Sequence, residues 1–372
     1  MENENLCDTI ENEDQRIEKR AARIAARRKR KKKHPFLRIV AFFSILLLLI
    51  DISGRYISIF AVDGLVFWRT TDFYFEKNNS LDAVIIGSSS TYCFWDATYA
   101  WTENGIAVYP YSTPQQPLAS AKYVIEECKR SQPDAVYIIN LNLALVEDIE
   151  PAMIHFLSDV MPPSLNRIRM IEDLCEMGGY SGTEKIEYYY PLFAMHERWK
   201  LANLPEKNKS GRNCKGASVD DTFLTKTESV EGGFHLTDEY GEISQSVENT
   251  VTDLLEYLKS NNIQAAFFLS PGIISEENYA KHNTIMRMIE DSGYTVYNGF
   301  DHMEDMHLSL ANDYCDNSHT NITGARKFTS WLSGCLIDEF GFQDKRENSD
   351  YSSWDDAAEH YNWIVRCKQM SS

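Results

Sequence analysis

Short apolar segments alternate with segments of helical periodicity along most of this chain. The apolar segments, which we predict to be strands, cover 82–87, 106–111, 134–142, 264–272 and 294–300. The segments with apolar residues at helical spacing cover 115–132, 244–263, 275–293 and, as the last predicted helix, about 321–340. Such alternation is typical of a mostly parallel sheet with helices on both faces. We therefore predict a three-layer α/β/α fold.

A basic block stands directly before the longest apolar run. Residues 27–34 are Arg, Lys and a final His, and residues 39–50 are apolar except for one Ser. A membrane-spanning helix needs about 20 residues. We predict a basic cytoplasmic tail at 1–34 and a transmembrane signal anchor at 35–60. The positive-inside rule then predicts that 61–372 lies outside the cytoplasm. The alternative is a cleaved secretory signal, although no clear small-x-small site follows.

The charge distribution limits the classes of partner. Residues 1–34 carry 11 Lys and Arg against 7 Asp and Glu, a net charge of +4. With −18 over the whole chain, residues 35–372 therefore carry −22. The basic block is thus a local feature next to the anchor, and we expect no nucleic-acid partner. No Cys-x-x-Cys pair is present, so a metal-binding knuckle is not supported.

The segment at about 145–245 interrupts the alternation. It contains helical patches, an aromatic stretch and a polar loop. We predict an insertion between the third and fourth strands that covers the carboxyl edge of the sheet, within one extracytoplasmic domain at 61–372.

The first predicted strand ends in Gly87, which three serines follow. Reactive groups of open α/β sheets lie outside the carboxyl ends of the strands, where Ser89 is expected. A Ser-rich turn on its own is more often a simple turn, because Gly and Ser favour such conformations.

A second motif lies before the predicted last helix. Asp316 and His319 are three residues apart, a spacing at which the carboxylate can hold the imidazole in one tautomer while the other nitrogen faces a nucleophile. Asn321 or Thr320 is then expected to cap the helix. Taken alone, Asp316 is more often a capping residue and His319 a surface imidazole.

Together, these two motifs make the chain similar to the SGNH/GDSL hydrolase superfamily. The resemblance is to its membrane-anchored bacterial branch, which includes DltD-type teichoic-acid D-alanylation proteins and polysaccharide O-acetylation proteins. It covers about 80–145 and 245–340. It implies a flavodoxin-like, SGNH-type sheet, with Ser89 as nucleophile, His319 as base and Asp316 orienting that base.

The sequence departs from the superfamily pattern at the oxyanion hole. The usual glycine after the second strand is missing, so Ser112 or Thr113 would have to supply that donor. The Gly-x-Asn-Asp block is also missing. Asn140 and Asn142 are the nearest amides, with a narrow preference for Asn142. Either Asn could instead be a strand-end turn residue.

The insertion contains the stretch His196-Glu-Arg198-Trp199, which resembles the same branch. Arg198 and Trp199, with His196 beside them, could bind the phosphate or sugar of a polymer, because Arg donates two parallel hydrogen bonds to anions and Trp stacks on apolar faces. The favoured alternative is a buried Trp and an Arg that forms a salt bridge.

These observations predict an extracytoplasmic serine esterase or O-acyltransferase that needs no metal or organic cofactor. Its predicted substrate is an acyl ester of a cell-surface polysaccharide or teichoic acid. The resemblance implies a membrane-bound O-acyltransferase as partner if the reaction is a transfer. The alternative is a non-catalytic, membrane-anchored scaffold or binding module with the same fold. A phosphate-binding α/β protein ranks last, because the chain lacks Gly-x-Gly-x-x-Gly and a P-loop lysine.

Overall fold

The computed structural model describes residues 16–25, 35–59, 64–195, 212–225 and 233–371. The chain divides after Ser53 into two compact units. Most of helix α2 (Pro35–Ile59) belongs to the first unit. Its stretch Pro35–Gly54 is long and apolar enough to cross a membrane, since 20 residues of α-helix span about 30 Å.

A five-stranded sheet forms the centre of the second unit within the described residues. Its strands are β1 (Ala83–Gly87), β2 (Val108–Ser112), β3 (Val136–Asn140), β4 (Ala265–Leu269) and β5 (Thr295–Asn298). All neighbouring strands are parallel, in the order β2-β1-β3-β4-β5. The predicted strands and the α/β class are therefore confirmed. This is the doubly wound order in which the connections reverse direction between β1 and β3, and such reversal points are where ligands bind.

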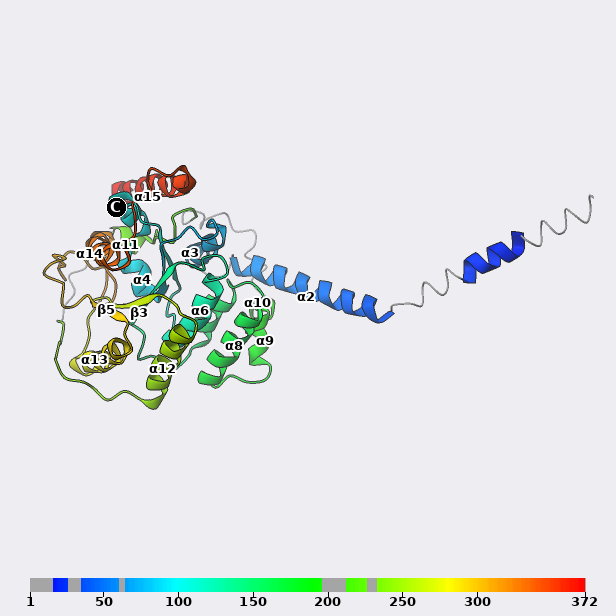
Figure 1. The fold of residues 1–372 in the computed structure, drawn as a ribbon, viewed down its shortest axis with the longest axis horizontal. Coiled ribbons are helices and arrows are strands. Elements are labelled where there is room, and N and C mark those ends of the chain that lie inside the picture. Colours follow the sequence, from blue (N-terminus) through cyan, green and yellow to red (C-terminus); the bar gives the residue numbers. More distant parts are fainter. Residues whose placement is uncertain (1–15, 26–34, 60–63, 196–211, 226–232, 372) are drawn as a thin grey trace, which may run out of the picture. The chain divides into compact units, whose positions relative to one another are not determined.

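Burial explains why the strands could be predicted from apolar runs. Every residue of β1 to β4 is buried, whereas the edge strand β5 is half-buried. Helices lie on both sides of the sheet in Figure 1. One side carries α6 (Ala121–Cys128), α12 (Gln245–Ser260) and α13 (Glu276–Asp291), and the other carries α4 (Ser89–Phe94) and α14 (Ile322–Phe340).

The segment between β3 and β4 contains several short helices. They are α7 (Pro151–Ser158), α8 (Leu165–Met177), α9 (Glu184–Tyr189), α10 (Pro191–Met195) and α11 (Asp221–Thr225). Helix α8 packs beside α6 in the helical layer. The buried side chain of Arg167 in α8 joins this helix to α7 and α9, because its guanidinium donates to the carbonyls of Ser158 and Tyr188.

A further helix, α15 (Ser352–Ser371), follows α14, so the expectation that α14 would be the last helix is wrong. Helix α15 packs against α5 (Ala97–Asn104). The rings of Trp354 and Trp101 lie 5.7 Å apart, and the Trp101 Nε1–H donates to Asp355 over 2.8 Å. Tyr361 also donates to the carbonyl of Ser218, which ties α15 to the insertion.

Candidate active site

Ser89 is the first residue of α4, immediately beyond the carboxyl end of β1. The turn between them requires a glycine, because a Cβ on Gly87 would stand 2.4 Å from the Cβ of Asn140 and 2.5 Å from the Oγ1 of Thr91. The neighbouring serines bond to each other, with 2.8 Å between the Oγ atoms of Ser88 and Ser90. Of the three serines, only Ser89 is partly exposed.

Asp316 and His319 share one tight turn before α14. Asp316 Oδ1 accepts hydrogen bonds from the backbone N–H groups of Ser318 and His319, at 2.8 and 3.0 Å. Asn321 caps α14 by accepting from the N–H groups of Thr323 and Gly324. Asp316 therefore shapes the turn and contacts the imidazole, whereas Asn321 is the helix cap, so the capping interpretation of Asp316 is wrong.

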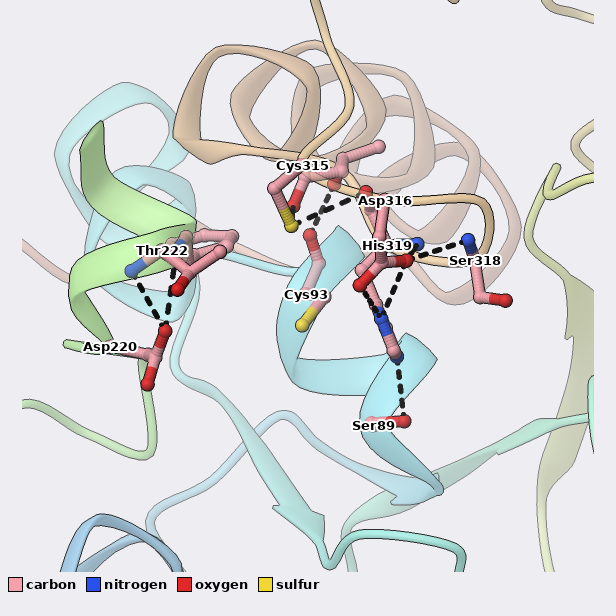
Figure 2. A network of polar contacts seen from close by, with 10 residues as sticks. Ser89, Cys93, Asp220, Thr222, Cys315, Asp316, Ser318 and His319 are labelled. Atoms are coloured by element: carbon pink, nitrogen blue, oxygen red, sulfur yellow. Dashed lines mark hydrogen bonds and ion pairs between the residues drawn. The ribbon is translucent and has the colours of Figure 1, made fainter. Parts of the chain in front are cut away.

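The structure brings Ser89, His319 and Asp316 into one line of contacts (Figure 2). The Nδ1 atom of His319 lies 2.8 Å from Asp316 Oδ2 and 3.0 Å from Oδ1. Its Nε2 atom lies 2.8 Å from Ser89 Oγ. With the proton on Nδ1, the imidazole donates to Asp316, and its Nε2 atom can accept the proton of the Ser89 hydroxyl.

The environment keeps Asp316 ionised. Burial raises the pKa of Asp316, but hydrogen bonds from the His319 ring and the Ser318 N–H outweigh this effect, so the pKa lies below its ordinary value of 3.8. The nearby thiol of Cys93 has the opposite environment, because burial raises its pKa well above the ordinary value of 9.0. A thiol that stays protonated is a poor nucleophile, so the hydroxyl of Ser89 is the better candidate at this site.

A pocket of about 330 Å³ opens beside Ser89 and His319. Its other lining residues come from five parts of the second unit and are Arg69, Tyr92, Cys93, Pro114, Ser218, Asp220, Thr222, Phe223, Cys315 and Asp316. The part of the insertion at 218–223 thus reaches the pocket, whereas α8 lies in the helical layer beside α6.

The two candidates after β2 are poorly suited to bind an oxyanion. The N–H of Thr113 already donates to the Gly87 carbonyl and to Gln116 Oε1, at 3.3 and 3.1 Å. Ser112 is fully buried at the end of β2. Pro114, the next residue after this pair, is the one that lines the pocket.

The two candidates after β3 differ in what their amides do. Asn142 bridges β3 to β4: its Nδ2 donates to the Ser270 carbonyl, and its Oδ1 accepts from the N–H and hydroxyl of Ser270. Asn140 packs against Gly87, at the turn that leads to Ser89, and its Nδ2 donates to Asn142 Oδ1. Asn140 thus lies at the turn that leads to Ser89, but neither asparagine lines the pocket, so the narrow preference for Asn142 stays a prediction.

His196, Arg198 and Trp199 lie outside the described residues. The structure instead adds Arg69 and Asp220 to the pocket, and neither belongs to a motif that the sequence made visible. Within the described ranges, no group of three His, Cys, Asp or Glu side chains is arranged to hold a metal ion.

No known family model matches this chain, and neither a curated protein nor a solved structure matches it significantly. The chemistry of the site therefore has to be argued from its own geometry.

Proposed function

We propose that this chain is a membrane-anchored serine esterase or O-acyltransferase of the SGNH/GDSL type, which acts on acyl esters of cell-surface polysaccharides or teichoic-acid-type polymers. The observation that carries the proposal is the line of contacts from Ser89 through His319 to Asp316 beside one pocket. The resemblance of the two motifs to that superfamily supports the proposal, as does the position of Asn140 at the carboxyl end of β3.

The reaction begins when Ser89 Oγ attacks the carbonyl carbon of an ester and His319 Nε2 takes the hydroxyl proton. A tetrahedral oxyanion forms, towards which the amide of Asn140 can donate. The bond from carbon to the leaving oxygen then breaks, and His319 returns the proton to that oxygen. The acyl group remains on Ser89.

The second half of the reaction decides between hydrolysis and transfer. His319 takes a proton from water or from a hydroxyl of the acceptor, and the resulting oxygen attacks the acyl-enzyme carbonyl. The Ser89 ester bond breaks, and the proton passes to Ser89 Oγ. Water gives a free acid, whereas an acceptor hydroxyl gives a new ester.

The location is part of the proposal. The basic block at 27–34 before α2 supports a cytoplasmic N-terminus, and the domain that carries Ser89 would then lie outside the cytoplasm. For a transferase, a membrane-bound O-acyltransferase would bring the acyl group across the membrane.

The three consecutive serines allow a matched test. Full-length protein in detergent, with folding checked by circular dichroism, would be treated with a fluorophosphonate probe and with p-nitrophenyl acetate. We expect labelling and turnover in wild type and in Ser90→Ala, whose hydroxyl contacts Ser88, and loss of both in Ser89→Ala and His319→Ala. Folded wild type that takes no label and turns over no ester would contradict the proposal and favour a non-catalytic scaffold.

A further inference from the structure

The wall of the pocket beside Ser89 contains a buried guanidinium. Arg69 belongs to α3 (Gly64–Thr71), and only 5% of the residue is exposed. Its Cζ atom lies 3.5 Å from the ring centroid of Tyr92, on the helix that begins with Ser89. The Arg69 carbonyl accepts a hydrogen bond of 2.7 Å from Tyr109 in β2. Arg69 is thus held between the sheet and the helix of the nucleophile.

Each of the two acidic residues that line the same pocket accepts hydrogen bonds from N–H groups of its own turn. Asp220 Oδ1 accepts from the N–H groups of Thr222 and Phe223 at the start of α11, at 2.9 and 3.4 Å. Asp316 holds His319, as described above. Among the described residues that line the pocket, Arg69 is the one permanently cationic side chain. A guanidinium can donate two parallel hydrogen bonds to a carboxylate or phosphate.

The volume of the pocket and the net charge of residues 35–372 limit further which ligands fit the pocket. A pocket of about 330 Å³ lies at the lower end of the range for small-molecule sites, which suits a short acyl group or a single polymer unit. Residues 35–372 carry a net charge of −22, so long-range attraction would not bring an anion to this pocket. Recognition of an anion here would have to be local, at Arg69.

We propose that the substrate carries a carboxylate or phosphate close to the ester that Ser89 attacks, and that Arg69 binds this anionic group. This inference rests on the esterase or transferase function proposed above. The anionic group has two possible sources, the acyl group or the acceptor.

The experiment compares full-length wild type in detergent on two pairs of probes. The first pair is the 4-methylumbelliferyl ester of butyric acid and the hemisuccinate ester, which has the same number of acyl carbons and a terminal carboxylate; spontaneous hydrolysis is subtracted. The second pair is glycerol and glycerol 1-phosphate as acceptors of the butyryl group. Preference for the hemisuccinate assigns the anion to the acyl group, and preference for glycerol 1-phosphate assigns it to the acceptor.

We expect wild type to prefer one anionic probe by about tenfold or more in kcat/KM, as for a charge-assisted pair. Arg69→Met should bring the ratio of kcat/KM for the anionic and neutral probes towards one. Arg69→Lys keeps the charge but cannot donate two parallel hydrogen bonds, so it should retain part of the preference. Arg287→Met is the matched control, because Arg287 also stacks on a tyrosine, Tyr240, but its side chain is 62% exposed and outside this pocket.

Measurements on the wild type alone distinguish failure of the Arg69 proposal from failure of the proposed function. Turnover of the butyrate ester with no preference for either anionic probe would overturn the role of Arg69 and leave the esterase intact. An unchanged ratio in folded Arg69→Met would also overturn it. Absence of turnover and of fluorophosphonate labelling would instead contradict the proposed function.

Discussion

The Oγ atom of Ser89 lies 2.8 Å from the Nε2 atom of His319, although 230 residues separate them in the sequence. The pair is held together by contacts of α4 with α14 and with the residue Thr320 before it. Thr320 Oγ1 donates to the carbonyl of Cys93, and Thr329 Oγ1 donates to the carbonyl of Phe94. The distance between Ser89 and His319 therefore depends on the packing of two helices on the same face of the sheet.

Replacement of Asp316 by Asn should slow fluorophosphonate labelling of Ser89 by about 10²- to 10⁴-fold. An amide cannot stabilise the imidazolium, and its NH₂ group can turn towards the ring and favour the wrong tautomer. The measurement is the rate of labelling at fixed probe concentration.

A matched control is Asp305→Asn, because Asp305 also contacts a histidine three residues away, His302, over 3.0 Å. That pair is exposed and lies outside the pocket, so its loss should leave the rate unchanged. Labelling of Asp316→Asn at the wild-type rate would mean that the carboxylate only shapes the turn.

Gly87→Ala should destabilise the protein by about 1–3 kcal/mol, because the new Cβ would stand 2.4 Å from Asn140 Cβ and force the ends of β1 and β3 apart. Gly334→Ala, within α14, meets nothing within 4 Å and should stabilise by about 0.5–1 kcal/mol through helix propensity. Urea unfolding of both variants measures these values, and equal stability of the two would contradict the close approach at Gly87.

The sheet and the two motifs that meet in the candidate site could be predicted from the sequence, because both depend on local patterns. The strands are short, continuously apolar and buried, and the spacing of Asp316 and His319 is contained in one turn. The meeting of Ser89 with His319 followed from a general rule, since the carboxyl ends of parallel strands share one edge.

The parts that could not be predicted depend on long-range contacts. The amide of Asn142 is occupied by Ser270, 128 residues away, and this pairing follows from the neighbouring positions of β3 and β4. Arg69 reaches the pocket from a helix before β1.

Helix α15 was missed although its sequence shows helical periodicity. Its buried residues Trp354, Ala358, Tyr361 and Val365 recur at helical spacing, and this pattern is sufficient to predict the helix.

Substitution of Asn140, at the end of β3, should mainly affect the reaction rate, whereas substitution of Asn142 should mainly affect stability. Asn140→Ala should lower the rate of p-nitrophenyl acetate turnover by about 10²- to 10³-fold, as expected for loss of an oxyanion donor, with a small change in Tm. Asn142→Ala removes three hydrogen bonds to Ser270, each worth about 1 kcal/mol, and should mainly lower Tm. The reverse pattern would restore Asn142 as the donor.

His282 should make stability depend on pH. Burial lowers the pKa of His282 below its ordinary value of 6.5, although the carbonyls of Asn278 and Leu141 lie 2.8 and 3.2 Å from its ring nitrogens. Below about pH 6.5 the unfolded chain therefore binds a proton that the folded chain does not. The contribution of the neutral imidazole is present above this pH and is lost as the pH falls towards the lower, folded-state pKa.

The expected result is a decrease in the free energy of unfolding between pH 7.5 and 5.5, and one such proton contributes at most about 1.4 kcal/mol per pH unit. In His282→Gln this decrease should be smaller, even if the variant is less stable at pH 7.5. His360→Gln, at an exposed histidine, should keep the wild-type slope. Urea unfolding across this pH range measures all three, and equal slopes in wild type and His282→Gln would show that other groups cause the acid sensitivity.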